Sequence, residues 1–314
     1  MSRASAAGAP LDRRATVRAI GRIAARELVE AGRSRFTWAM AILLAALPLL
    51  VSALGLGVHG GLALQGFART SASLINLNLY LVPLFGVLMA HASVVGEAER
   101  GTLRMLAAQP IARRWVVVGK FLGLGALTSA LVGGSLAFGG VLVALRAGVE
   151  HLGDYAILIG SAVLLGFSFT AIGLWLSTVA RDRAQALAAS FGAWFLFVIV
   201  LDLALLALFI ALSRLFIAPD YAPSVELLHR ELAAGQSGSQ VRFPWISGLL
   251  LLNPTDVFRL ANVLRVPAVR QVMALTRSLP GWLASGWTLG LAALFWIAAP
   301  LWAAIRRFER MDVE

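Results

Sequence analysis

Few side chains in this sequence could carry metal or redox chemistry. Cysteine is absent, and the 314 residues include only four histidines and six methionines, whereas Cu(I) and other soft ions are bound by thiolate, thioether and imidazole groups. Met89 and His91 are the one close pair of such residues inside an apolar run. Because residues two apart on a helix point about 200° away from each other, these two cannot share an ion. We therefore expect no metal site and no redox cofactor in this chain.

Phosphate-binding and hydrolytic motifs are also missing. Gly119-Lys120 matches the end of a Walker motif, but that motif needs a glycine five residues earlier and Ser or Thr after the lysine. Arg114 and Phe121 stand at those positions, and neither HExxH nor GxSxG occurs. We expect no catalytic residue, so ATP and Mg²⁺ must be bound by a partner chain if the protein depends on them. Lys120 is the only lysine, which we attribute to the arginine-rich composition.

An acidic residue, Asp202, interrupts one of the long apolar runs. A carboxylate at the centre of a membrane costs about 2.5 to 3.5 kcal/mol, and such residues mark functional sites. We expect Asp202 to face the interior of a helix bundle or dimer and to pair with a hydroxyl or tryptophan donor on another span. A structural polar contact and a proton-carrying role remain alternatives for this residue.

The elements that position these residues are membrane-spanning helices. Apolar residues make up 59% of the chain and charged residues 14%, with a mean hydropathy of +0.82, which is more apolar surface than a soluble domain can bury. Runs of about 20 apolar residues span a bilayer, and continuous runs favour helices. We predict an all-α polytopic membrane protein with one transmembrane domain over residues 1–314. Its six expected spans are 36–58, 74–95, 115–145, 156–180, 186–212 and 282–305.

The basic residues indicate how this domain lies in the membrane. The net charge of +11 comes from arginines beside the apolar runs, where anionic lipid headgroups explain them better than nucleic acid does. Eight arginines precede the first span, whereas the short loops on the opposite side hold only Arg69 and Arg146. Because basic residues concentrate on the cytoplasmic side, we place both termini in the cytoplasm of a bacterial inner membrane. Arginines at positions 18, 22 and 26 predict that the cytoplasmic segment 1–35 contains an amphipathic helix on the lipid headgroups.

The cytoplasmic loop 96–114 combines charged residues with a small apolar surface. Thr102 can cap a short helix that Pro110 ends, which leaves Leu103 and Leu106 on one side. Such a helix suits a groove on a partner, although a solvated loop whose charges hold the topology explains the residues equally well. The order Glu-x-Glu-x-Gly-Thr-Leu, then Pro and Arg, then Gly-Lys resembles the coupling region of type-2 ABC permeases. The resemblance implies ATPase contacts at Glu97, Glu99, Arg100, Gly101, Thr102, Leu103, Leu106 and Pro110.

A second motif lies in the long segment 213–281 between the fifth and sixth spans. Asn253 fits a helix N-cap, Pro254 the first helical position and Asp256 the third, where a carboxylate meets the positive end of the helix dipole. We expect another helix after Pro267. We predict an extracytoplasmic helical insertion outside the membrane core, which either docks a periplasmic partner or only closes a loop over the bundle. The expected docking residues are Asn253, Pro254, Asp256, Phe258, Arg259, Arg265 and Arg270.

The runs 251–262 (Leu-Leu-Asn-Pro-Thr-Asp-Val-Phe-Arg-Leu-Ala-Asn) and 193–203 resemble the NosY-type permeases of nitrous oxide reductase maturation. With the coupling loop, the resemblance covers residues 75–264, and a longer stretch between Leu212 and Trp245 departs from it. It implies a permease dimer, a cytoplasmic ABC ATPase dimer, a periplasmic β-helical protein and a copper-chaperone lipoprotein. Motion passed to the periplasmic partners would then support copper-site maturation, with cargo transport left open. A general ABC-2 exporter of lipid, glycan or drug is one alternative, and a proton-linked secondary transporter using Asp202 is another.

Overall fold

The computed structural model describes residues 13–57, 63–102, 111–147, 152–216, 246–265, 282–283 and 285–311. Within these ranges every regular element is a helix, which confirms the predicted all-α class. The long helices are α2 (Arg35–Gly57), α3 (Ala63–Ala90), α6 (Arg113–Thr128), α7 (Gly134–Ala147), α8 (Leu152–Val179), α9 (Arg183–Phe195), α10 (Leu201–Phe216) and α14 (Gly286–Glu309). The remaining helices are α1 (Arg13–Gly32), α4 (Val95–Glu99), the 3₁₀ helix η4 (Ile246–Leu252) and α12 (Pro254–Arg265).

Several of these helices are suited to crossing a membrane. Five stretches are long and apolar enough, and a sixth is formed if α1 and α2, which meet at 77°, are taken together. Because α1 carries five arginines in 20 residues, α2 is the part of this pair suited to the hydrocarbon core. Two stretches contain π-helical segments, η1 (Ser129–Gly133) between α6 and α7 and η3 (Leu196–Val200) between α9 and α10. The chain is thus an integral membrane protein.

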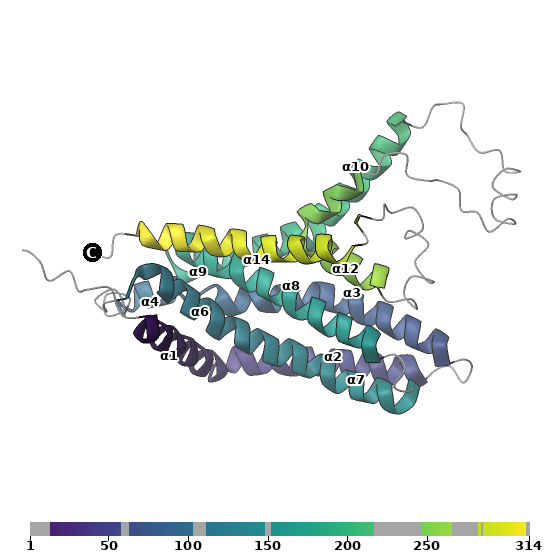
Figure 1. Ribbon diagram of the computed structural model, residues 1–314, viewed down its shortest axis with the longest axis horizontal. Coiled ribbons are helices and arrows are strands. Elements are labelled where there is room, and N and C mark those ends of the chain that lie inside the picture. Colours follow the sequence, from purple (N-terminus) through teal and green to yellow (C-terminus); the bar gives the residue numbers. More distant parts are fainter. Residues whose placement is uncertain are drawn as a thin grey trace, which may run out of the picture.

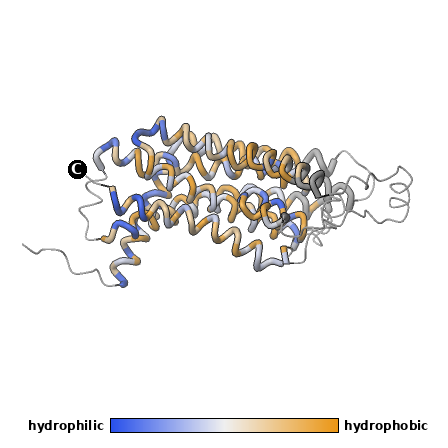
Figure 2. The backbone as a smooth tube through the Cα atoms, turned by 90° about the horizontal axis from the view of Figure 1, so that it is seen from above, coloured by the Kyte–Doolittle hydropathy of each residue, from blue (hydrophilic) through white to orange (hydrophobic). Residues whose placement is uncertain are grey.

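The spans lie side by side, and the polar elements gather at one end of the bundle. Figure 1 shows α1, α4 and the C-terminal end of α14 together there, and Figure 2 shows that the most hydrophilic stretches of backbone lie at the same end. We call this the charged end. At the opposite end α10 leans away from the bundle (Figure 1). Both ends of the described chain therefore lie on one side of the apolar layer, as an even number of spans requires.

Helix α8 forms the centre of the bundle, because α3 and α14 both pack along it. Small residues allow this close approach: a Cβ on Gly173 would lie 2.5 Å from the carbonyl oxygen of Val87, and one on Gly86 would lie 2.8 Å from that of Gly166. Membrane helices that present glycine to one another can pack backbone against backbone. Large side chains such as Phe85 fill the core beside these contacts.

Helix α1 packs against α6 in the same way, through two glycines four residues apart. A Cβ on Gly119 would lie 2.9 Å from the Cβ of Ile23, and one on Gly123 would lie 2.8 Å from the Cβ of Glu27 and closer still to the carbonyl oxygen of Ala24. Ile23 and Glu27 are buried as a result. The described helix is therefore docked on the bundle, while its predicted contact with lipid headgroups stays a prediction.

We expect Gly123→Ala to loosen α1 from α6, because the new methyl group would meet backbone that cannot move independently. Overpacking of this kind costs about 1 to 3 kcal/mol. The matched control is Gly134→Ala in the same span, where nothing lies within 4 Å of the added Cβ. Thermal unfolding of both purified variants checks the prediction. Equal melting temperatures for Gly123→Ala and Gly134→Ala would show that the α1 to α6 contact adapts freely.

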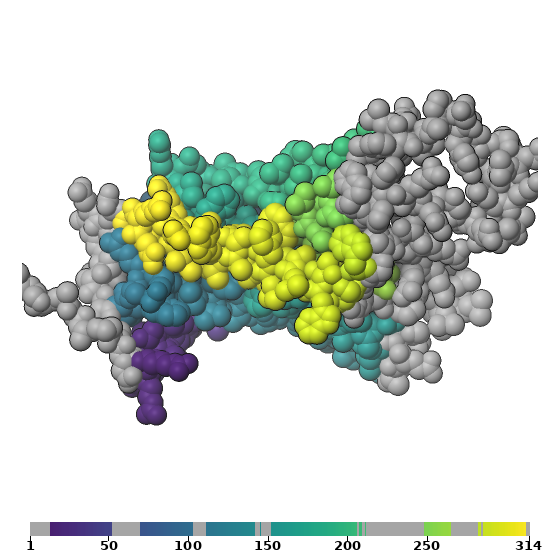
Figure 3. Space-filling model, turned by 45° about the horizontal axis from the view of Figure 1, so that its top comes forward, coloured from purple at the N-terminus to yellow at the C-terminus, as the bar shows by residue number. Residues whose placement is uncertain are grey.

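The insertion before the last span packs on the bundle. Helix α12 packs against α8, α14 and α3. Its Asn262 donates a hydrogen bond of 2.9 Å to Ser161, and its apolar residues cluster with Leu289; Ser161 and Leu289 belong to the predicted spans. Figure 3 shows α12 beside α14 at the end of the molecule away from α1. The chain enters through η4, turns at Asn253 and leaves through α12, and we call this part the re-entrant turn. The apolar face of α12, including the buried Phe258, packs on the bundle. The predicted insertion therefore does not stand free of the bundle, while its position relative to the membrane core stays a prediction. The helix expected after Pro267 lies outside the described residues.

Candidate functional site

The predicted coupling residues begin on the short helix α4 at the charged end. After α4 the chain turns at Gly101, whose φ of 71° is a conformation that favours glycine. Thr102 donates its hydroxyl hydrogen bond back to the carbonyl oxygen of Glu97 at 3.3 Å, so within the described residues it closes the preceding helix. The predicted helix that follows Thr102, with Leu103, Leu106 and Pro110, lies outside the described residues. We call residues 96–102 the coupling segment.

A buried charge cluster holds the coupling segment. The amine of Lys120 on α6 contacts the carboxylate of Glu27 on α1 and lies 2.8 Å from that of Glu97 on α4. It also donates a hydrogen bond of 2.9 Å to the carbonyl oxygen of Ser93. The side chains of Lys120 and Glu97 are only 1% and 3% exposed. We call Glu27, Glu97 and Lys120 the charge cluster; it joins three helices at one ammonium group.

The electrostatic balance of this cluster includes a fourth residue. Two carboxylates face one ammonium group, and Arg26 supplies a second positive charge 3.7 Å from Glu97. Burial raises the pKa of the Glu27 carboxyl above its usual value, and the charge of Lys120 opposes that shift. Lys120 therefore favours the ionised form of Glu27 inside the protein.

Exposed ion pairs hold the coupling segment from two sides. Arg100 lies 3.2 Å from Glu30 on α1. On the other side, Arg183 at the start of α9 lies 2.9 Å from Glu99 and donates a hydrogen bond of 3.1 Å to the carbonyl oxygen of Gly96. A Cβ on Gly96 would lie 2.9 Å from the Arg183 guanidinium, so a larger residue here would push the guanidinium out of this contact.

The structure therefore divides the predicted coupling residues into two groups. Glu99, Arg100 and Gly101 are exposed at the charged end, where a partner can reach them. Glu97 is buried in the charge cluster, so it does not offer the exposed surface that the predicted ATPase contact needs. Glu27 was not among the predicted site residues, and Lys120 was predicted to have no role. A single lysine at the start of an apolar span and an acid on the apolar side of α1 were the available signals.

A second set of ion pairs joins the re-entrant turn to the fifth span. The guanidinium of Arg259 donates to both carboxylate oxygens of Asp202, at 2.8 and 3.2 Å. It also lies 3.1 Å from Asp256, whose side chain is 3% exposed. The expected hydroxyl or tryptophan partner of Asp202 is thus wrong, and the partner is Arg259. The pair could be found only by knowing that α12 folds back into the bundle.

The turn at Asn253 is fixed by hydrogen bonds to both α12 and the π-helical segment η3. The Asn253 carboxamide oxygen accepts a hydrogen bond from the backbone N–H of Thr255 at 3.1 Å, and α12 begins at Pro254. This confirms the predicted helix start. The Asn253 amide nitrogen also donates a hydrogen bond of 2.9 Å to the carbonyl oxygen of Phe197 in η3. π-Helical geometry disturbs the regular hydrogen bonding of a helix and recurs at functional sites.

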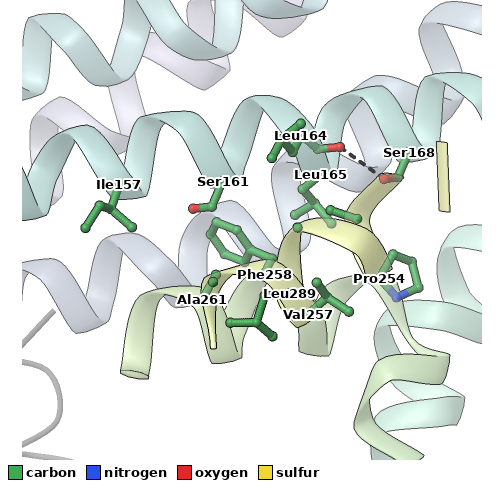
Figure 4. Close-up of a pocket in the computed structure, with 13 residues that line it drawn as sticks. Ile157, Ser161, Leu164, Leu165, Ser168, Pro254, Val257, Phe258, Ala261 and Leu289 are labelled. Atoms are coloured by element: carbon green, nitrogen blue, oxygen red, sulfur yellow. Dashed lines mark hydrogen bonds between the residues drawn. The ribbon is translucent and has the colours of Figure 1, made fainter. Parts of the chain in front are cut away.

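These contacts change the expected role of the docking residues. Asn253, Pro254, Asp256 and Phe258 are buried, and Arg259 is engaged by two carboxylates, so these side chains hold α12 in place. Figure 4 shows Phe258 between α12 and α8. A partner surface made of these side chains is not available in this arrangement. Arg265 ends α12 with a side chain that is not described, and Arg270 lies outside the described residues.

A pocket of about 260 Å³ lies between α8, α12 and α14. Most of its lining is apolar, with Ser161 and Ser168 as the hydroxyl groups; Figure 4 shows Ser168 turned back on its own helix, where it donates to the carbonyl oxygen of Leu164 at 3.0 Å. Sites for small molecules usually measure roughly 300 to 1,000 Å³ and present several convergent polar groups. This pocket offers no comparable set of ligand contacts.

Metal-binding side chains are not gathered anywhere in the described ranges. No group of three or more His, Asp or Glu residues there is arranged to hold an ion. The His91 ring bonds the carbonyl oxygen of Leu88, and the Met89 sulfur accepts from the Thr37 hydroxyl at 3.6 Å. Each side chain thus has a structural contact of its own.

A bundle of apolar helices, with a short charged segment secured at one end and a re-entrant turn at the other, is an all-α polytopic membrane domain. The model of the ABC-2 family transporter protein matches residues 22–313, so the chain belongs to the ABC-2 transporter family. It is 34% identical over 299 residues to the probable ABC transporter permease protein NosY of Pseudomonas aeruginosa, covering 93% of this chain and 98% of that protein. It is also 34% identical over 297 residues to the protein of that name from Stutzerimonas stutzeri, covering 92% and 97%.

These findings confirm the resemblance drawn from the coupling loop and from residues 251–262. The chain is an ABC-2 transporter permease similar to NosY. Membership of this family implies a permease dimer and an ATPase partner, and it is consistent with a subunit that has no enzymatic activity of its own.

Proposed function

We propose that this chain is the permease subunit that couples ATP hydrolysis in a separate cytoplasmic ATPase to maturation of the copper sites of nitrous oxide reductase in the periplasm. The names of two relatives, each matched over more than nine-tenths of this chain, support the choice of pathway. The observation that carries the coupling role is the coupling segment itself, which is joined to α1, α6 and α9 by ion pairs. A segment held on three helices can pass a displacement to the whole bundle.

The proposal places both termini and the charged end in the cytoplasm of the inner membrane. This is supported by the arginine-rich α1 and the positive-inside rule. An ATPase dimer, with ATP and Mg²⁺ bound in its own chains, then meets the coupling segments of two permease copies. A periplasmic β-helical protein and a copper-chaperone lipoprotein complete the proposed complex. Motion of the bundle reaches them at the end where α12 lies. Cargo transport is a separate element of the proposal, without a supporting site among the described residues.

Two other functions remain as alternatives with less support. A general ABC-2 exporter of lipid, glycan or drug would share the family and the coupling segment, but the two named relatives favour the copper-site pathway. A proton-linked secondary transporter would need a free carboxylate inside the membrane. Both oxygens of Asp202 are held by Arg259, so Asp202 does not offer one.

Complementation tests the proposed function directly. We expect this chain, produced in a strain that lacks its own permease of this type, to restore copper loading and activity of nitrous oxide reductase. The control is the same strain carrying this permease together with an ATPase partner unable to hydrolyse ATP, which should restore neither. Full membrane insertion and ATPase co-purification without any restored copper loading would assign the chain to another export pathway.

A further inference from the structure

The charge cluster at Lys120 is more deeply buried than any other ion pair found in the described residues. Its three members come from α1, α4 and α6, and the Lys120 side chain is 1% exposed. By contrast, the pairs Arg100 with Glu30 and Arg183 with Glu99 have side chains that are 36 to 50% exposed. Ion pairs on a protein surface contribute about 0.2 to 1 kcal/mol, whereas breaking a buried one costs about 3 to 5 kcal/mol. The buried contact therefore dominates how firmly the coupling segment is held.

The backbone is built to bring these charges together. Gly119 and Gly123 lie on either side of Lys120 in the sequence and present no side chain where α1 crosses α6. The close crossing places Glu27 within reach of the Lys120 amine, and the turn before α4 supplies the carbonyl oxygen of Ser93 as a further acceptor. A lysine that only kept the protein soluble would be exposed and would need no close helix crossing. A lysine that anchored the protein in the membrane would point toward the lipid headgroups.

We propose that Glu27, Glu97 and Lys120 are positioning residues for energy coupling: they lock the coupling segment to α1 and α6, so that a push from the ATPase moves these elements as one body. This inference rests on the proposed coupling to a cytoplasmic ATPase. Glu97 is the member on the segment that the ATPase moves, Lys120 passes the displacement to the third span, and Glu27 passes it to α1. The cluster stays closed throughout the ATP cycle, because a contact that opened would no longer pass the movement of the coupling segment to α1 and α6.

The single lysine of this chain makes the closed state measurable without any substitution. In the purified complex of permease and ATPase in lipid nanodiscs, an amine-reactive acetylating reagent can modify only Lys120 and the N-terminal amine of this chain. We expect peptide mass spectrometry to find that Lys120 is acetylated at least tenfold more slowly than the same lysine in the denatured chain, both without nucleotide and after trapping with ATP and vanadate. Labelling of Lys120 in the trapped state that reaches the rate of the denatured chain would overturn the proposal.

Substitutions then test whether the charges matter for coupling as well as for folding. In the neutral triple variant Glu27→Gln, Glu97→Gln and Lys120→Met, we expect copper loading per ATP hydrolysed to fall at least tenfold. The transposed pair Glu27→Lys with Lys120→Glu keeps one ammonium group and two carboxylates together. Its copper loading per ATP hydrolysed should therefore lie well above that of the neutral triple variant and close to the wild-type value. Arg22→Gln, at an exposed position of α1, is the matched control and should keep the wild-type ratio. A neutral triple variant with the wild-type ratio would contradict the proposal.

The two proposals fail in different ways. If the wild-type complex hydrolyses ATP but never restores copper loading, the proposed pathway is wrong, while protection of Lys120 in the trapped state still decides whether the cluster stays closed. If copper loading is restored and Lys120 becomes labelled during the cycle, the pathway stands and the locking role is lost.

Discussion

Lys120→Met is expected to destabilise the protein by about 3 to 5 kcal/mol, the usual cost of removing one partner from a buried ion pair. The carboxylate of Glu27 would then remain buried with no cation in contact, and Glu97 would keep only Arg26, at 3.7 Å. Thermal unfolding of the detergent-purified permease measures the loss. Arg18→Met on the exposed face of α1 is the control for removing a basic residue, and we expect it to change stability little. A Lys120→Met protein as stable as this control would mean that the cluster is open to water.

The pH dependence of the same variant separates lost charge pairing from lost packing. Burial already raises the pKa of Glu27 in the wild-type protein, and without Lys120 nothing in the cluster opposes the shift. A carboxyl whose pKa is higher in the folded state than in the unfolded state makes folding more favourable at low pH, and this contribution disappears as the pH rises through the folded-state pKa. We therefore expect Lys120→Met to regain part of its stability when the pH is lowered from neutral toward the unfolded-state pKa.

The all-helical membrane architecture could be predicted from the sequence because a membrane span is a local signal. A run of about 20 apolar residues identifies itself without knowledge of its neighbours, and the first run, 36–58, corresponds to α2 at Arg35–Gly57. The start of α12 was predictable for the same reason, since cap, proline and acidic residue follow one another directly. Family resemblance was carried by motifs of this local kind.

The charge cluster and the re-entrant turn were not predictable in this way, because both depend on contacts between distant parts of the chain. Glu27 and Lys120 are 93 residues apart, and Asp202 and Arg259 are 57 apart. An amphipathic helix such as α12 has the same pattern whether its apolar face meets a soluble partner or a membrane bundle. The sequence therefore singled out Asp202 and Arg259 without indicating that they contact each other, and it gave Glu27 and Lys120 no role at all.

Arg259→Met is the second large effect we expect, because Arg259 holds two carboxylates of different elements. Its removal leaves Asp256, 3% exposed, without a cation, and releases Asp202 on the fifth span. Since Arg259 and Asp202 are themselves about one-third exposed, we expect a loss near the lower end of the buried range, about 3 kcal/mol. Reversal to Glu should cost more, because it places a third carboxylate beside the two.

The comparison that isolates the charge effect is the neutral set Arg259→Met, Asp202→Asn and Asp256→Asn. Removing all the charges leaves no buried ion unpaired, so this triple variant should be more stable than Arg259→Met alone, by about 1 to 3 kcal/mol. Thermal unfolding measures both, and limited proteolysis of the 246–265 region reports whether α12 has left the bundle. Because α12 is also held by apolar packing and by the bond from Asn253 to Phe197, the neutral triple should keep the region protected. If Arg259→Met and the triple variant were equally unstable and equally cleaved, the guanidinium would be acting through packing alone, and the ion pairs between α12 and the fifth span would carry no energy.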